Sequence, residues 1–201
     1  MTIEFKQIKY AVIFEALAGE TACGDQYLVK EFDDFTLLVV VDGLGHGEDA
    51  ALAAKKAIKT VDNNANAPLE TIFKLCAQAL ADTRGAAMTI VRIDNACPSV
   101  HYKCIGNITG IYWHIGERAK LKKDSFLFEN GIVGSCSPMV LPTRHLNLSS
   151  GDVIILATDG IKANFTDEPP QWKSPKQIAD EIFTNYRNKG DDGLILVAQL
   201  L

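Results

Sequence analysis

The sequence contains no apolar stretch long enough to cross a membrane. A transmembrane helix needs about 20 consecutive apolar residues, and no run among the 201 residues approaches that length. Near the start of the chain, Glu15 interrupts the apolar run 11–14 too early for the core of a signal peptide. We therefore expect a cytoplasmic protein without a membrane partner.

Cysteine is scarce and follows no paired pattern. The five cysteines are odd in number and contain no C-x-x-C pair, which indicates free thiols in a reducing compartment. None has an arginine six positions later, so the Cys–Arg loop of tyrosine-phosphatase-type enzymes is absent. The four histidines show no spacing typical of zinc ligands. These absences argue against thiolate catalysis and against a zinc site.

Basic residues are also few. Lys and Arg number 20 against 25 Asp and Glu, giving a net charge of −5 with no basic stripe, so we expect no nucleic-acid partner. No phosphate-binding G-x-x-x-x-G-K-[ST] stretch is present. The glycines of Gly43-x-Gly45-x-Gly47 suggest a dinucleotide-binding turn, but the third glycine of that fingerprint falls on Glu48 and no parallel strand is predicted after the helix. The spacing argues against a dinucleotide site.

The order of predicted elements favours an α+β fold. Composition is ordinary for a globular protein, at 47% hydrophobic, and no repeat, low-complexity segment or linker divides the chain. We therefore expect one domain over residues 1–201. Apolar patterns predict helices around 50–61, 68–80 and 175–186, with two of them consecutive between blocks of strands. The predicted strands are 5–16, 25–32, 35–41, 86–93, 99–105, 110–115, 152–157 and 194–201.

One stretch gives no clear pattern. Residues 117–147 mix Lys, Gly, Ser and Pro, and within them residues 131–142 are a candidate flap that helps to select a partner.

Four short acidic signals are the most informative feature of the chain. They are Cys23-Gly24-Asp25, Asp42-Gly43, Thr158-Asp159-Gly160 and Gly190-Asp191-Asp192. A single Asp-Gly is usually a turn. Two of these aspartates, however, directly follow apolar runs typical of buried strands, where a carboxylate is costly unless it is paired or bound to a metal.

Glycine beside these aspartates would let the backbone turn sharply, so that a carboxylate and a carbonyl could face one small hard ion. Adjacent acids such as Asp191 and Asp192 repel each other unless solvent or a cation compensates. If the four signals converge, they form an oxygen-only site for Mg²⁺ or Mn²⁺, with room for two ions.

In this order, the signals resemble those of the metal-dependent PP2C (PPM) serine/threonine phosphatases, and most closely the small bacterial SpoIIE/RsbX-like branch. The resemblance runs from about Gly24 to Leu201 and includes Arg84-Gly85-Ala86 and Gly106-Asn107. It implies an αββα sandwich of two antiparallel sheets flanked by helices. It also implies hydrolysis of phosphoserine or phosphothreonine on a small STAS-type regulatory protein in a bacterial stress or signalling switch.

The resemblance also implies roles for individual residues. Asp42 would bridge two Mn²⁺ or Mg²⁺ ions, with the Gly43 carbonyl as a further ligand of one. Asp159 and Asp191 would bind the other ion, and Asp25 would support the first, through water. A metal-bridged hydroxide would attack phosphorus, so Asp42 and Asp159 would be catalytic through the metal-activated water. We expect a monomer.

The sequence departs from the family pattern in three places. Larger members carry His two residues after the loop aspartate, where this chain has Leu44, so the usual general acid does not carry over. No arginine that could bind phosphate precedes Arg84. Gly193 follows the Asp191-Asp192 pair in place of the usual apolar residue and Thr, which favours Asp191 as the ligand.

Other interpretations stay open at this point. His46 lies in the acidic loop, where a loop-shaping role is at least as reasonable as a catalytic one. The chain could be a non-catalytic partner-binding module that keeps the fold. It could also be a two-metal phosphoesterase that acts on small molecules, because substrate choice depends on surface shape.

Overall fold

The computed structural model describes residues 2–4, 7–96, 99–115, 121–135, 142–167, 169–170 and 173–201. Cys97, Cys136 and half of the candidate flap (136–141) lie outside these ranges. The strands are β1 (Ile3–Glu4), β2 (Ile8–Glu15), β3 (Asp25–Glu31), β4 (Phe35–Gly43), β5 (Ala86–Asp94), β6 (Ser99–Ile105), β7 (Thr109–Ile115), β8 (Leu121–Ser125), β9 (Arg144–Asn147), β10 (Val153–Ala157) and β11 (Gly193–Leu200). The helices are α1 (Gly47–Asn63), α2 (Leu69–Ala79) and α3 (Pro175–Tyr186), with a short 3₁₀ turn at Ala163–Asp167.

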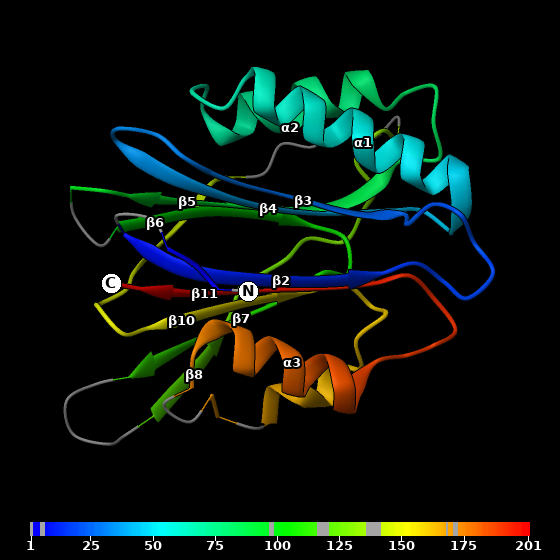
Figure 1. The fold of residues 1–201 in the computed structure, drawn as a ribbon. Coiled ribbons are helices and arrows are strands. Elements are labelled where there is room, and N and C mark those ends of the chain that lie inside the picture. Colours follow the sequence, from blue (N-terminus) through cyan, green and yellow to red (C-terminus); the bar gives the residue numbers. More distant parts are fainter. Residues whose placement is uncertain are drawn as a thin grey trace.

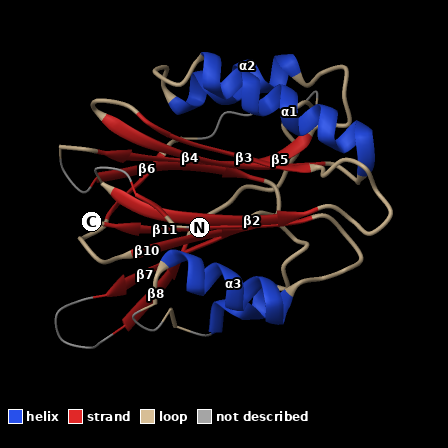
Figure 2. Ribbon diagram, viewed as in Figure 1, coloured by secondary structure: helices blue, strands red, loops and turns tan. Residues whose placement is uncertain are grey.

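Two antiparallel sheets stack face to face, with helices on both outer faces (Figure 1). One sheet has the strand order β1-β2-β11-β10-β7-β8, and the other has the order β3-β4-β5-β6-β9. All the strand pairs within the two sheets are antiparallel. Helices α1 and α2 cover the five-stranded sheet and α3 covers the other (Figure 2). The predicted αββα sandwich is confirmed.

Strand β4 shows how the sequence builds this layering. Successive side chains of a strand point to opposite faces. Leu38 and Val40 pack into the core between the two sheets, whereas Leu37 and Val39 pack against α1 and α2. Because both faces are covered, the strand is a continuous apolar run rather than an alternating pattern. Strands β10 and β11 repeat this arrangement between the central core and α3.

Helix α1 lies close to the end of β4 because its contact face consists of small residues. Ala50, Ala53 and Ala54 are fully buried. A side chain at Gly43 would overlap the carbonyl of Ala50, so only glycine fits at this crossing. This close packing fixes the position of the β4 end, which carries Asp42.

The sequence did not predict strands β8 and β9, which fall in the stretch 117–147. Both lie at a sheet edge and are largely exposed. Edge strands often carry charged residues, which discourage further pairing, so the apolar alternation that marks a strand is missing. Part of the candidate flap is also fixed, because Val133 and Ala86 exchange two backbone hydrogen bonds, of 2.9 and 3.0 Å. None of the helices described is both long and apolar enough to span a bilayer.

Candidate metal centre and substrate groove

Two of the predicted acids lie opposite each other on neighbouring strands. Asp25 opens β3 and pairs directly with Asp42 near the end of β4. The Asp25 carboxylate is buried and accepts a hydrogen bond from the Thr158 hydroxyl, at 2.7 Å. The backbone N–H of Leu194 donates to the same hydroxyl, at 2.9 Å. Because Thr158 directly follows β10 of the other sheet, its bond to Asp25 joins the two sheets at the acidic end.

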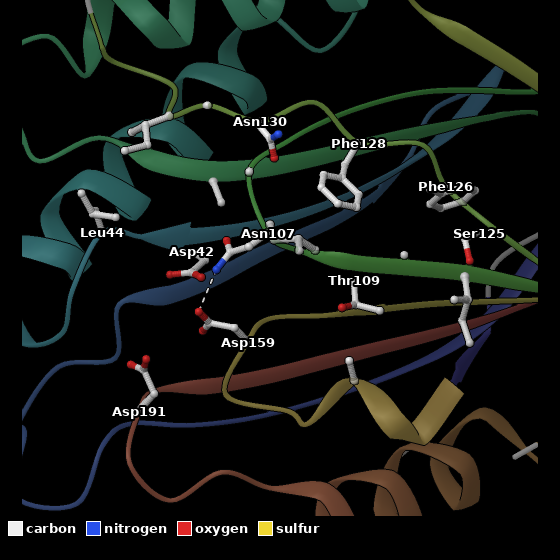
Figure 3. Close-up of a pocket in the computed structure, with 18 of the residues that line it drawn as sticks. Asp42, Leu44, Asn107, Thr109, Ser125, Phe126, Phe128, Asn130, Asp159 and Asp191 are labelled. Atoms are coloured by element: carbon white, nitrogen blue, oxygen red, sulfur yellow. Dashed lines mark hydrogen bonds between the residues drawn. The ribbon is translucent and has the colours of Figure 1, made fainter. Parts of the chain in front are cut away.

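The other two acids come from the opposite sheet. Asp159 lies just beyond the end of β10 and Asp191 lies just before β11, and these strands are antiparallel neighbours. Asp159 Oδ2 accepts a hydrogen bond of 2.7 Å from Asn107 Nδ2 in the β6–β7 link. Asp42, Asp159 and Asp191 line one end of the same pocket (Figure 3). Residues far apart in the sequence therefore meet at one place.

The electrostatics of this end favour a bound cation. Burial raises the pKa of Asp42 to about 8, and the charges of Asp25 and Asp159 add to the effect. The pKa of Asp25 rises to about 7, mainly through burial, although the hydrogen bond from Thr158 opposes the shift. Burial and the charge of Asp191 raise the pKa of Asp159. A divalent cation would relieve this repulsion and keep the carboxylates ionised.

The donor groups fit a hard, partly hydrated ion. Among the described residues, no three Asp, Glu, His or Cys side chains converge into a ready-made cage. Mg²⁺ does not require one, because it usually keeps several waters and binds one or two carboxylates. Oxygen donors also favour Mg²⁺ or Mn²⁺ over softer metals. The residues present therefore fit the predicted ions.

The neighbouring Asp192 has a different task. Its Oδ1 accepts the backbone N–H of Leu17 and its Oδ2 accepts that of Gly24, both at 2.8 Å. Its carboxylate is thus occupied in joining two loops. Asp191, and not Asp192, lines the pocket, and its role as the metal ligand stays a prediction.

The glycines beside the acids are required because other parts of the chain pack closely against them. The sequence argument expected sharp turns, but Gly24, Gly43 and Gly160 are not among the glycines with positive φ. A side chain at Gly160 would overlap the carbonyl of Asp192, and one at Gly24 would lie 2.8 Å from the Ala50 Cβ. The expectation of a sharp turn is wrong here, because these glycines are required by packing.

Arg187 is a residue that the sequence reasoning missed. Its side chain is only 7% exposed. It donates to the carbonyl of Gly160, at 3.1 Å, and to the carbonyl of Asp191, at 2.5 Å. The guanidinium therefore holds together the two loops that carry Asp159 and Asp191. No local pattern marked it, because it follows α3 and lies 27 residues from Gly160.

His46 lies outside the residues that line the groove. It immediately precedes α1, and its Nδ1 is 2.7 Å from Glu20 Oε1. This contact ties the loop around Glu20 to the start of the helix. The observation favours the loop-shaping role that the sequence left open.

The acids occupy one end of a groove of 610 Å³. The rest of it is neutral, with apolar side chains and several amide and hydroxyl groups. Besides the three aspartates, it is lined by Leu44, Gly45, Ala87, Gly106, Asn107, Ile108, Thr109, Gly110, Ile111, Ser125, Phe126, Phe128, Asn130, Gly131, Ile132, Ala163 and Thr166.

Comparison with known families agrees with this geometry. The family described as Stage II sporulation protein E (SpoIIE) matches residues 33–200. The chain belongs to the SpoIIE family. This match covers strands of both sheets and every aspartate of the site except Asp25.

Individual relatives cover almost the whole chain. Phosphoserine phosphatase RsbX of Bacillus subtilis (strain 168) is 26% identical over 185 residues, which are 90% of this chain and 89% of RsbX. A crystal structure of RsbX in complex with magnesium superposes with a TM-score of 0.88 at 24% identity, over 100% of this chain and 99% of the other. A structure from work on the bacterial stressosome, described as a modular system adapted to control secondary messenger signaling, gives 0.86 at 29% identity, over 96% and 99%. The resemblance to the SpoIIE/RsbX-like branch is thus confirmed.

Proposed function

We propose that this chain is a metal-dependent protein phosphatase that hydrolyses phosphoserine or phosphothreonine. One observation carries the proposal: Asp42, Asp159 and Asp191, from three separate segments, meet at the end of one groove. The relation to a phosphoserine phosphatase of similar length supports it. We extend the proposal to a monomeric, cytoplasmic protein with one catalytic domain.

The same residues would hold the ions. Asp42 and the Gly43 carbonyl would bind on the β4 side, Asp159 and Asp191 on the β10–β11 side, and Asp25 would support the first group through water. When bound, two Mn²⁺ or Mg²⁺ ions would acidify a bridging water and so supply the hydroxide nucleophile at neutral pH. The RsbX complex with magnesium supports this choice of ion.

Other side chains of the chain position these acids. Asn107 orients the Asp159 carboxylate through its hydrogen bond, and Arg187 holds the two loops of the β10–β11 side. Leu44, which lines the groove, has no proton to give to the leaving serine oxygen. Catalysis would therefore depend on the metal-activated water rather than on a side-chain acid at this position.

We propose a small phosphorylated STAS-type regulator as the partner, in a bacterial stress or signalling switch. The relation to RsbX supports a regulatory phosphoprotein substrate. The similarity to a structure from stressosome work supports the setting in stress signalling.

The test is phosphate release with Mn²⁺ from a phosphorylated STAS protein and from p-nitrophenyl phosphate. Wild type should hydrolyse both, and Asp42→Asn should lose about 10³-fold in kcat/KM, since the ions supply several kcal/mol of transition-state stabilisation. Asp62→Asn, at an exposed ion pair with Lys30, is the matched control and should retain full activity.

The outcomes separate the alternatives. Equal activity of wild type and Asp42→Asn would contradict the mechanism. No hydrolysis of either substrate by wild type would favour a non-catalytic binding module. Turnover of p-nitrophenyl phosphate alone would favour a small-molecule phosphoesterase.

A further inference from the structure

The groove is larger than a phosphoserine side chain requires. Its 610 Å³ falls within the range of about 300–1,000 Å³ that accommodates drug-sized ligands. The acids occupy one end only. The remaining space can receive the residues that flank a phosphoserine, so its lining bears on substrate choice.

The part of the groove beyond the acids has an apolar wall, formed by Ile108, Phe126, Phe128 and Ile132. Phe126 is buried and stacks on Tyr102, with ring centroids 4.5 Å apart. Phe128 is 56% exposed and projects above Thr109 in Figure 3. Large apolar side chains at a groove surface mark a place where a ligand is buried.

This wall is held rigidly because its backbone crosses from one sheet to the other. The N–H of Phe126 donates to the Gly110 carbonyl of β7, at 2.8 Å, and the N–H of Glu129 donates to the Cys104 carbonyl of β6, at 3.1 Å. Phe128 lies between these two anchors. An anchored backbone reduces the conformational entropy that is lost when a ligand covers this segment.

The opposite rim carries a second exposed apolar side chain. Leu44 is 47% exposed, and its N–H donates to the Gly85 carbonyl, at 3.0 Å. Figure 3 shows Leu44 and Phe128 on either side of Asp42 and Asn107. A segment with its phosphate at the acids would therefore meet apolar surface on both sides.

The lack of basic side chains among the described residues of the groove disfavours acidic substrate residues at this wall. No Lys, Arg or His is found among the described residues that line the groove. Arg84 and Lys123 each contact a lining residue, but Arg84 donates to Asp49, at 2.7 Å, and Lys123 donates to the Thr166 carbonyl, at 2.8 Å. A carboxylate buried against Phe128 would lack a partner, which is costly.

We propose that the apolar wall is a specificity subsite, which takes an uncharged apolar side chain directly next to the phosphoserine of a protein substrate. This inference rests on the proposed phosphatase function and adds the chemistry of the substrate segment. Phe128 is its central contact, and Leu44 would contact the substrate residue on the other side of the phosphoserine.

The test uses three synthetic phosphopeptides of one Gly-rich scaffold, whose phosphoserine is flanked on both sides by Leu, by Gly or by Asp. With Mn²⁺, wild type should prefer Leu over Gly by about tenfold in kcat/KM, since small apolar groups in a pocket give discrimination of this order. The Asp peptide should be the poorest substrate. Phe128→Ala should bring the Leu-to-Gly ratio close to one.

Leu127→Ala is the matched control. Leu127 is the chain neighbour of Phe128 and is 57% exposed, but it does not line the groove. This variant should keep the wild-type Leu-to-Gly ratio.

Equal wild-type rates on the Leu and Gly peptides would overturn the subsite, as would the same loss of preference in Leu127→Ala. Hydrolysis of p-nitrophenyl phosphate with none of the three peptides would also overturn it. If wild type releases phosphate from none of these compounds, it is the proposed function itself that fails.

Discussion

The two ends of strand β10 each carry an aspartate, in opposite surroundings. At the start, Asp152 is buried and accepts the backbone N–H groups of Ile115 and Ser149, at 2.8 and 2.9 Å, and lies 2.9 Å from His114 Nδ1. At the other end, Asp159 receives one side-chain hydrogen bond, from Asn107, and the charge of Asp191 raises its pKa.

The difference separates an acid that the chain itself compensates from an acid that we propose to bind a cation. Asp152 obtains its compensation from the chain itself, as does Asp192 with two backbone N–H groups. Asp42 and Asp159 face other carboxylates instead. Asp159 has a side-chain donor in Asn107, but burial and the charge of Asp191 still raise its pKa, and a bound cation would oppose this shift. We therefore expect the acids of the groove to respond to metal, and Asp152 and Asp192 not to respond.

The largest expected effect concerns activity. Asp159→Asn should reduce kcat/KM on a phosphoprotein by about 10³-fold, because it removes a ligand from the ions that stabilise the transition state. Asp152→Asn, seven residues and about 23 Å away along the strand, should stay within about threefold of wild type. Steady-state kinetics with Mn²⁺ measure both. Similar losses in the two variants would remove the distinction between the two ends.

For stability, a substitution at Asp152 should have a larger effect than one at Asp159. Asp152→Ala removes the acceptor of two part-buried backbone N–H groups and the partner of His114, and each lost hydrogen bond costs about 1 kcal/mol, so the free energy of unfolding should fall by about 3 kcal/mol. Asp159→Asn should not lower it in metal-free protein, since the substitution relieves repulsion. Urea denaturation in EDTA measures both changes. A larger loss for Asp159→Asn would contradict the comparison.

A metal ion should stabilise the folded protein only by binding to the acids at the end of the groove. At 100 times its dissociation constant, Mn²⁺ should raise the free energy of unfolding of wild type by about 2.7 kcal/mol, and EDTA should reverse this. Asp152→Asn should respond like wild type, whereas Asp42→Asn should lose most of the gain. Thermal denaturation with and without Mn²⁺ gives the comparison. An undiminished response in Asp42→Asn would place the ion elsewhere.

Asn107 should have a smaller effect. Residues that hydrogen-bond to metal ligands typically change metal affinity by 10- to 100-fold, and Asn107 orients Asp159 from outside the carboxylate cluster. We expect Asn107→Ala to weaken Mn²⁺ binding by about tenfold in calorimetry. Asn130→Ala, in the same pocket, is the control and should bind Mn²⁺ like wild type. Equal affinity of Asn107→Ala and wild type would show that the bond does not position Asp159.

The smallest effect concerns pH. The pKa values of about 7 for Asp25 and about 8 for Asp42 exceed the unfolded value. Between about pH 4 and these values the folded state holds more protons, so the stability of metal-free protein should fall as pH rises. We expect urea denaturation in EDTA to show a loss of about 1 kcal/mol between pH 5 and pH 8, because water in the metal-free groove reduces the repulsion between the carboxylates. Asp42→Asn should flatten the slope, and a rise in wild-type stability over this range would contradict the raised pKa values.

Much of this architecture was accessible from the sequence, for a physical reason. Strands buried on both faces leave long apolar runs, and an aspartate directly after such a run stands out, as Asp42 and Asp159 do. The predicted helix 175–186 was equally local, and the structure begins it with a capping box between Ser174 and Gln177.

Other parts depend on contacts between distant segments and left no local trace. Asn107 reaches Asp159 across 52 residues, and Arg187 reaches Gly160 across 27. The edge strands β8 and β9 lack apolar alternation because neither contains a fully buried residue. The apolar wall around Phe128 follows β8, within the stretch whose pattern gave no prediction. Sequence could thus indicate the acids, but not the residues that hold them or the wall beside them.

The most direct test of the metal centre is anomalous X-ray diffraction from a crystal of the wild-type protein grown with Mn²⁺. We predict manganese peaks among Asp42, Asp159 and Asp191, and none at Asp152 or Asp192. An empty acidic end in a crystal saturated with Mn²⁺, or a peak bound by Asp152, would contradict it.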